Sequence, residues 1–135
     1  MKIGIKEEFK YEMISSKQIV IEILCHCLKQ HEQRVRYWII HNDLISKVME
    51  ALKDNSKILE LQVTKFIKSV IVNNDDNLNK MIINNDIFCQ IIQIFNRHKH
   101  KDNAVLSAVL DLFEHVRKQN LKKIITYLVR IISLK

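Results

Sequence analysis

The feature that most constrains this chain is a sequence pattern that occurs twice, with a shift of 43 residues between the copies. The first copy runs from Tyr37 to Leu52 and the second from Lys80 to Phe95. Equivalent positions agree in identity or apolar character, namely Ile39/Ile82, Ile40/Ile83, Asn42/Asn85, Asp43/Asp86, Leu44/Ile87, Val48/Ile91, Met49/Ile92 and Leu52/Phe95. A period of about this length is typical of armadillo and HEAT repeats, whose units bury their apolar faces by stacking on each other.

The same shift relates three long amphipathic segments. We expect each to be a helix with one buried face, formed by Val20, Ile23, Leu24, Cys27 and Leu28, then by Leu61, Val63, Phe66, Ile67, Val70 and Ile71, then by Leu106, Val109, Leu110 and Phe113. The prediction is therefore an all-α, armadillo/HEAT-like, right-handed solenoid of about three repeats. Residues 1–135 would form a single domain, which we expect to be a fragment of a longer stack.

Composition agrees with an all-helical chain. One glycine and no proline among 135 residues disfavour hairpins and turn-rich folds, and they exclude the glycine-rich phosphate loops of nucleotide-binding folds. No apolar run reaches the roughly 18 residues of a membrane span. The three cysteines cannot all pair within the chain, which favours a reducing compartment. We expect a soluble, intracellular protein that does not contact membranes.

Local signals place the helix ends. We expect a weakly packed first helix over residues 2–14, a break with an N-cap at Ser15-Ser16, and a bend at residues 31–33. Asp43 and Asp86 each precede an apolar helix, and their carboxylates would accept hydrogen bonds from the first turn. Residues 54–56, 73–77 and 96–103 are polar enough to be loops, and a last helix follows Asn120.

The formal charge of +7 favours an acidic partner or nucleic acid. A general bias of the source towards Lys and Asn explains the charge equally well. Residues Arg97 to Lys101 form a basic stretch that we interpret as a solvated loop, with phosphate contact as the less favoured alternative.

No catalytic or metal-binding constellation is found in the sequence. Cys25 and Cys27 resemble zinc ligands, but on a helix they point about 200° apart and cannot share one ion. His98, His100 and His115 have no supporting groups. We therefore expect no enzyme activity, no metal and no cofactor.

Helix phase suggests a contact surface for a partner. Side chains opposite the predicted buried faces form a ladder along the long helices, and we expect them to line the groove of the solenoid: Glu22, His26, Lys29, Lys65, Lys68, Ser69, Val72, Asp111, Leu112 and His115. Cys25 and Ala108 lie on the same helical faces. Tyr37 and Trp38 are expected in the core; if exposed in this groove, they would be the best anchors for a partner.

Several stretches resemble the central armadillo-like region of the protein phosphatase 4 regulatory subunit 3 family, also called SMEK or Falafel. They are residues 19–27, 42–45 and 82–88, and above all residues 103–117, NAVLSAVLDLFEHVR. Order and spacing agree over roughly residues 9–130. Family members are longer, with an N-terminal domain that binds substrate peptides and a low-complexity tail, neither of which this sequence contains.

The resemblance implies a non-catalytic subunit, found in the nucleus and/or the cytoplasm, that serves as a scaffold in a serine/threonine phosphatase complex. Its expected partners are proteins: the catalytic subunit, other regulatory subunits and substrates. A basic helical-repeat protein that binds nucleic acid is the alternative, which steeply salt-dependent binding would identify.

Overall fold

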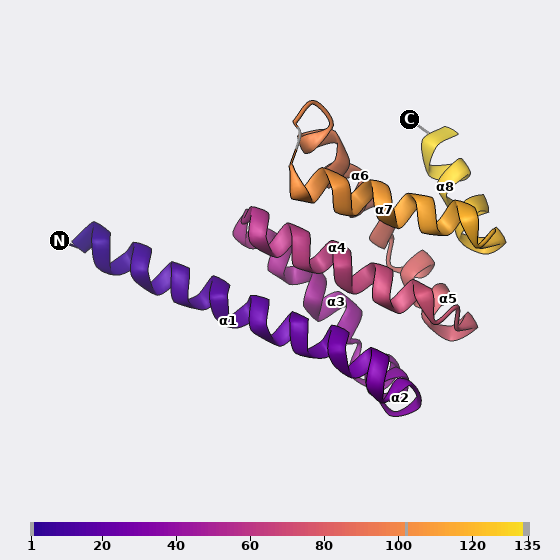
Figure 1. Ribbon diagram of the computed structural model, residues 1–135, viewed down its shortest axis with the longest axis horizontal. Coiled ribbons are helices and arrows are strands. Elements are labelled where there is room, and N and C mark those ends of the chain that lie inside the picture. Colours follow the sequence, from indigo (N-terminus) through magenta and orange to yellow (C-terminus); the bar gives the residue numbers. More distant parts are fainter. Residues whose placement is uncertain (1, 102, 134–135) are drawn as a thin grey trace.

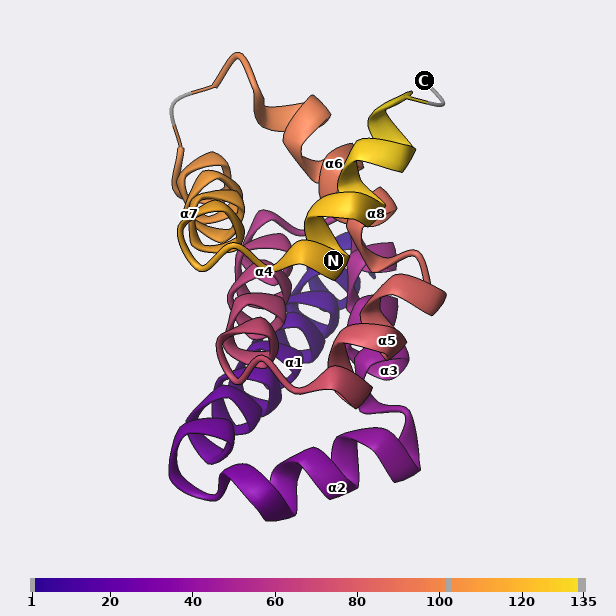
Figure 2. The ribbon, with the colours of Figure 1, turned by 90° about the vertical axis from the view of Figure 1, so that its right-hand side faces the viewer.

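The computed structural model describes the backbone of residues 2–101 and 103–133, and side chains from Glu8 onward. Within these ranges the chain is helical and has no strand, which confirms the all-α prediction. Figures 1 and 2 show the arrangement of the elements, which are α1 (Lys2–Gln30), α2 (Glu32–Asn42), α3 (Leu44–Met49), the 3-10 helix η1 (Glu50–Asp54), α4 (Lys57–Val72), α5 (Asp76–Asn84), α6 (Ile87–His98), α7 (Ala104–Lys118) and α8 (Lys122–Ser133).

The helices form a solenoid. The long helices α1, α4 and α7 lie side by side in chain order, and α4 packs between the other two (Figure 1). Contacts of α5 with both α2 and α8 make a second row. A shift of 43 residues carries α2, α3 with η1, and α4 onto α5, α6 and α7, so these are two equivalent three-helix units. Of the neighbouring units the described chain holds only α1 and α8, and the count of three repeats is not confirmed.

The helix caps differ from the prediction at Asp43 and Asp86. Both residues precede a helix, but neither carboxylate makes a capping hydrogen bond. Both adopt the left-handed conformation, with φ of 49° and 52°, which Asp tolerates better than most residues. They therefore reverse the chain between two helices. The side chains of Ser56, Asp75 and Asn103 cap α4, α5 and α7 instead.

Helix α1 does not break at Ser15-Ser16, as the sequence suggested. It runs without interruption from Lys2 to Gln30. Serine lowers helix propensity by only a few tenths of a kcal/mol, and no glycine or proline follows to end the helix. A serine that caps a helix N-terminus itself has an extended, non-helical backbone conformation. Helix α1 is helical at Ser15 and Ser16 and on both sides of them.

The buried face of α1 is rotated about the helix axis relative to the predicted face. Val20 and Ile23 are 56% and 55% exposed, whereas Ile21 and Leu28 are buried. The reason is that α1 has a neighbouring long helix, α4, on one side only. The counterparts of Val20 and Ile23 in α4 are fully buried, because α4 is packed on both sides. At the other end of the row, Leu110 of α7 is half exposed for the same reason.

The basic stretch near residue 98 is not wholly a solvated loop. His98 ends α6 and is buried. Its Nε2 lies 2.8 Å from Oε2 of Glu60, and its Nδ1 lies 3.0 Å from Nδ2 of Asn103. Because Oδ1 of Asn103 accepts the Leu106 N–H, its amide group donates to Nδ1, and the ring proton must sit on Nε2 and point to Glu60. This network joins α4, α6 and α7.

An ion pair that joins a long helix to the next unit of the repeat occurs twice, with opposite polarity. Lys17 of α1 pairs with Asp54 of η1. The equivalent residues one unit later are Glu60 of α4 and Arg97 of α6, whose Oε1 and Nη2 atoms lie 3.6 Å apart. Acid and base have thus exchanged places. The pair keeps its structural position, between a long helix and the short helix that follows.

Aromatic residues also depart from expectation. Tyr37 and Trp38 are exposed on α2, and the Tyr37 ring lies 3.9 Å from that of His41, so their prediction as core residues is wrong. The inward position of α2 is taken by Ile39. In α8, Tyr127 is buried and donates a hydrogen bond to Asp86.

Candidate functional site: a basic groove across the long helices

A cavity of about 570 Å³ runs across α1, α4 and α7, and we call it the basic groove. It contains all but two of the contact residues predicted from helix phase: Glu22, His26 and Lys29 from α1, Lys65, Lys68, Ser69 and Val72 from α4, and Asp111 from α7. They lie together because residues four and seven apart share one face of a helix and the long helices stack side by side. These eight residues therefore line one cavity.

Leu112 and His115 do not belong to this surface. Leu112 is fully buried, so its predicted outward position is wrong, and His115 is half-buried away from the cavity. By the 43-residue shift Leu112 corresponds to Ser69, which faces α1. On α7 the same position faces α4, and a leucine there enters the core. The repeat shift places a residue on the correct side of its helix, but it does not tell how deeply the neighbouring helix covers it.

Four further residues line the groove that the predicted set lacks: Cys25, Leu28, Gln62 and Asn73. Gln62 Nε2 donates to Oε1 of Glu22 at 3.1 Å, which ties α4 to α1. Burial raises the pKa of the Cys25 thiol, although a hydrogen bond with Ser69 and the positive charge of Lys29 lower it in part. Cys25 is thus a protonated thiol at neutral pH. Helix phase predicts Cys25 on the same face as Glu22 and Lys29, whereas it does not predict the other three residues. Ala108 does not line the groove.

The electrostatic balance of the groove is positive. Lys68 pairs with Asp111 across α4 and α7, and Glu22 accepts hydrogen bonds from Gln18 and Gln62. Lys29 and Lys65 form no ion pair within the described part of the chain. Two unpaired cations beside the apolar Val72 suit a partner segment that carries carboxylates next to an apolar side chain.

The groove's titratable groups do not form an acid/base pair. Glu22 and Asp111 belong to helices on opposite sides of α4 and are each engaged by a neighbouring side chain. Among the described side chains, those of residues 8–101 and 103–133, no three His, Cys, Asp or Glu come together as metal ligands would. The arrangement can bind a polar segment by charge and shape.

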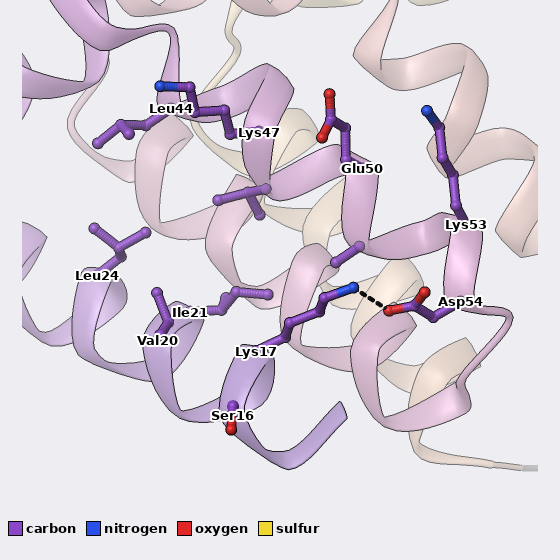
Figure 3. A pocket seen from close by; sticks show the side chains of 12 residues that line it. Ser16, Lys17, Val20, Ile21, Leu24, Leu44, Lys47, Glu50, Lys53 and Asp54 are labelled. Carbon is purple, nitrogen blue, oxygen red and sulfur yellow. Dashed lines mark hydrogen bonds and ion pairs between the residues drawn. The ribbon is translucent and has the colours of Figure 1, made fainter. Parts of the chain in front are cut away.

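A second cavity of about 610 Å³, which we call the apolar groove, lies between α1 and the α3–η1 segment (Figure 3). Its apolar lining comes from Val20, Ile21, Leu24, Leu44, Val48 and Ala51, and charged side chains surround it: Lys17, Lys47, Glu50, Lys53 and Asp54. Helix phase did not predict this groove, because it depends on what packs beside α1. In the described residues, no helix is both long and apolar enough to cross a bilayer.

Comparison with known proteins identifies the family. A family model described as "Phosphatase 4 regulatory subunit 3" matches residues 4–133. The chain is 28% identical over 110 residues to "Protein PPP4R3C1" of Mus musculus, covering 82% of this chain and 14% of that protein. It is 24% identical over 119 residues to "Serine/threonine-protein phosphatase 4 regulatory subunit 3" of Drosophila melanogaster, covering 88% of this chain and 12% of that protein.

"Suppressor of Mek1" of Dictyostelium discoideum is 25% identical over 122 residues, which cover 82% of this chain and 12% of that protein. No solved structure matches. The chain thus spans only 12–14% of the length of these relatives. The family match extends from α1 to α8 and includes the three long helices that form the basic groove. The chain therefore belongs to the phosphatase 4 regulatory subunit 3 family.

Proposed function

We propose that this chain is a non-catalytic scaffold region of a serine/threonine phosphatase 4-type complex, and that it holds a protein partner in the basic groove. The observation that carries the proposal is the groove itself: a cavity of about 570 Å³ with unpaired lysines, built from successive units of a stacked repeat. The matching family model and the Drosophila melanogaster relative, both described as phosphatase 4 regulatory subunit 3, support the type of complex.

The mechanism we propose is positioning. Helices α1, α4 and α7 are fixed relative to each other by a shared core, so the groove is formed before a partner arrives and little ordering entropy is lost on binding. A partner held there is kept near whatever else the complex binds, which raises the effective concentration of one for the other. The scaffold accelerates an encounter and takes no part in the chemistry.

The partner segment should be acidic. Lys29 and Lys65 project from adjacent long helices into the same cavity, and Val72 supplies an exposed apolar contact at its end. Carboxylates that face both lysines would steer the encounter, and the apolar contact would slow dissociation. A phosphatase catalytic subunit, another regulatory subunit or a substrate can each present such a segment.

The experiment is a binding titration of the 135-residue chain with purified phosphatase 4 catalytic and regulatory subunits. The Lys29→Glu/Lys65→Glu variant should weaken binding at least tenfold, because two attractive contacts become repulsive. Lys118→Glu/Lys122→Glu is the matched control, since both lysines are exposed and lie outside the groove. Equal loss in both variants, or no binding by the unmodified chain, would contradict the proposal. Steeply salt-dependent binding to RNA alone would favour the nucleic-acid alternative.

A further inference from the structure

Helix α1 carries an apolar stripe that nothing in the described chain covers. Phe9, Met13, Val20 and Ile23 lie on one side of the helix, because their spacing of three, four and seven residues repeats the helical turn. Phe9 is 63% exposed, and the other three are also open to solvent. Exposed apolar surface that is contiguous, as here, marks an interface.

The 43-residue shift indicates that two residues of the stripe, Val20 and Ile23, stand at packing positions of the repeat. The counterparts of Val20 and Ile23 in α4 are fully buried. Solvent exposure on α1 is therefore the exception within this repeat, and the stripe lacks a helix beside it.

The apolar groove is the other half of the same surface. Val20 lines it together with Val48 and Ala51. On the next long helix, α4, the α3–η1 segment makes the corresponding contacts, and this segment also borders α6 at a smaller cavity. The shape that fits this groove is thus an amphipathic helix of two to three turns.

The chain itself contains such a helix. Residues 8–14 at the start of α1, which we call the arm, extend beyond the packed body of the molecule (Figure 1). The arm presents Phe9 and Met13 on the stripe and the exposed carboxylates of Glu8 and Glu12 beside them. Because α1 is straight and continuous, the arm points away from its own groove.

The stripe is almost symmetrical about one residue. Phe9 and Ile23 lie equally far from Ser16 in sequence, and Met13 and Val20 lie nearly so. Two copies of α1 placed antiparallel would therefore cross at the small side chain of Ser16. Phe9 of each copy would then face Ile23 of the other. A two-fold interface needs this self-complementary order, in which residue i meets j and j meets i.

Charge supports the same arrangement. On the rim of the apolar groove, Lys17 and Asp54 pair with each other, whereas Lys47 and Lys53 form no ion pair within the described residues and outnumber Glu50. The rim is therefore positive. The arm, with two glutamates against Lys10, is negative.

We propose that the chain forms an antiparallel two-fold dimer through α1, in which the arm of each copy fills the apolar groove of the other. Val20 and Lys29 lie about 180° apart around α1, so the dimer leaves the basic groove open. The dimer is independent of the proposed phosphatase partner. A scaffold of this kind would present two basic grooves.

The first test is the mass of the 135-residue chain in solution, measured by light scattering and sedimentation from about 1 to 200 µM. The dimer predicts a rise from 16.1 kDa towards twice this value. Phe9→Ser/Ile23→Ser should weaken dimerisation by about a hundredfold, roughly tenfold for each of the two Phe9–Ile23 contacts in the dimer. Circular dichroism would verify that this variant remains folded, which the exposure of both residues predicts.

The matched control is Tyr11→Ser/Val129→Ser, which also removes two exposed apolar side chains but leaves the stripe intact. It should dimerise like the unmodified chain. A monomer at every concentration, or equal dissociation of both variants, overturns the proposal.

The second test places p-benzoylphenylalanine at Phe9 and locates its photocrosslinks by mass spectrometry. Crosslinks of dimer mass to residues 20–24 or 44–54 are expected, with few from the same probe at Tyr11. Crosslinks within one chain would mean that the arm folds back on its own groove. Dimer crosslinks to α8 would mean that copies stack head to tail. Either result, or no crosslink at all, overturns the antiparallel dimer.

Discussion

Helices α1 and α4 occupy equivalent places in the repeat, yet they are packed differently. Between α1 and α7, α4 buries side chains around most of its circumference, including Val63, Phe66 and Ile67. Helix α1 has one long neighbour and, from Glu8 onward, buries only Ile21 and Leu28. In a stacked repeat, the periodicity of a helix indicates which residues are able to enter the core. The neighbouring units decide which of them do.

The largest expected difference is between equivalent core positions on the two helices. Phe66→Ala in α4 should lower the free energy of unfolding by about 3–5 kcal/mol, because it opens a cavity in a fully buried site. Ile23→Ala, the equivalent change in α1, should cost less than about 1 kcal/mol. Urea unfolding followed by circular dichroism would measure both, at the lowest usable concentration so that self-association does not contribute. Equal losses of unfolding free energy would contradict the conclusion that α4 is packed more completely than α1.

The next difference concerns the polar contacts between helices. His98→Ala should destabilise the fold by about 2–3 kcal/mol, since it removes a buried hydrogen bond and leaves the Glu60 carboxylate with only the longer contact to Arg97. Lys17→Ala removes the equivalent contact between α1 and η1. There both side chains are about one-third exposed, so the expected cost is below about 1 kcal/mol.

Thermal and urea unfolding of the two variants would test this ordering. His98→Asn is a useful companion, because a shorter donor in the same place should recover part of the loss. A larger cost for Lys17→Ala than for His98→Ala would contradict the prediction that the more deeply buried contact, His98 with Glu60, contributes more to stability.

At the far end of the stack, Tyr127 makes stability depend on alkaline pH. Burial and the hydrogen bond to Asp86 raise the pKa of this phenol above its ordinary value of 10.0. Below pH 10 both folded and unfolded chains keep the proton, so the contribution is constant. Above pH 10 the unfolded chain releases it first, and this residue should lower the unfolding free energy by about 1.4 kcal/mol per pH unit.

Tyr127→Phe removes both the hydrogen bond and this titration. The variant should be about 1 kcal/mol less stable at pH 7. The gap between the two proteins should then narrow as the pH rises above 10, which urea unfolding at pH 8 to 11 would show. A gap that stays constant or widens would mean that the phenol is not the buried donor described here.

The smallest expected effect is that of Lys68→Ala. The pair of Lys68 with Asp111 joins α4 to α7, but the aspartate side chain is 60% exposed, and exposed pairs contribute at most about 0.5–1 kcal/mol. Urea unfolding at low and high salt would measure the difference, which salt should reduce further. A loss above about 2 kcal/mol would mean that this ion pair contributes substantially to the packing of α4 against α7.

Much of the architecture can be predicted from the sequence because the period and the helix breaks are local signals. The bend near His31, the turn at Asn55 and the buried face of α4 from Val63 to Ile71 all agree with the structure. Most of the predicted groove ladder also lines one cavity, because helix phase fixes which side chains share a face.

The failures have a common cause, which is that they depend on contacts between units. Val20 and Ile23 were assigned to the core because their pattern matches that of α4, and no local signal tells that one side of α1 is open. His98 looked like one of several basic loop residues until its contact with Glu60 placed it inside. Asp43 fits an N-cap by type, but its backbone turns the chain in the left-handed region instead.

The exchanged polarity of the two ion pairs has a consequence for how such an array can change length. If recombination deleted one 43-residue unit, Lys17 would no longer meet Asp54 but the residue in its place, Arg97. The helices would still have matching apolar faces, yet two cations would oppose each other at the new junction. The reversed polarity therefore distinguishes the correct neighbouring unit from an otherwise similar one. A shortened or reordered array would be destabilised by repulsion between like charges at the new junction.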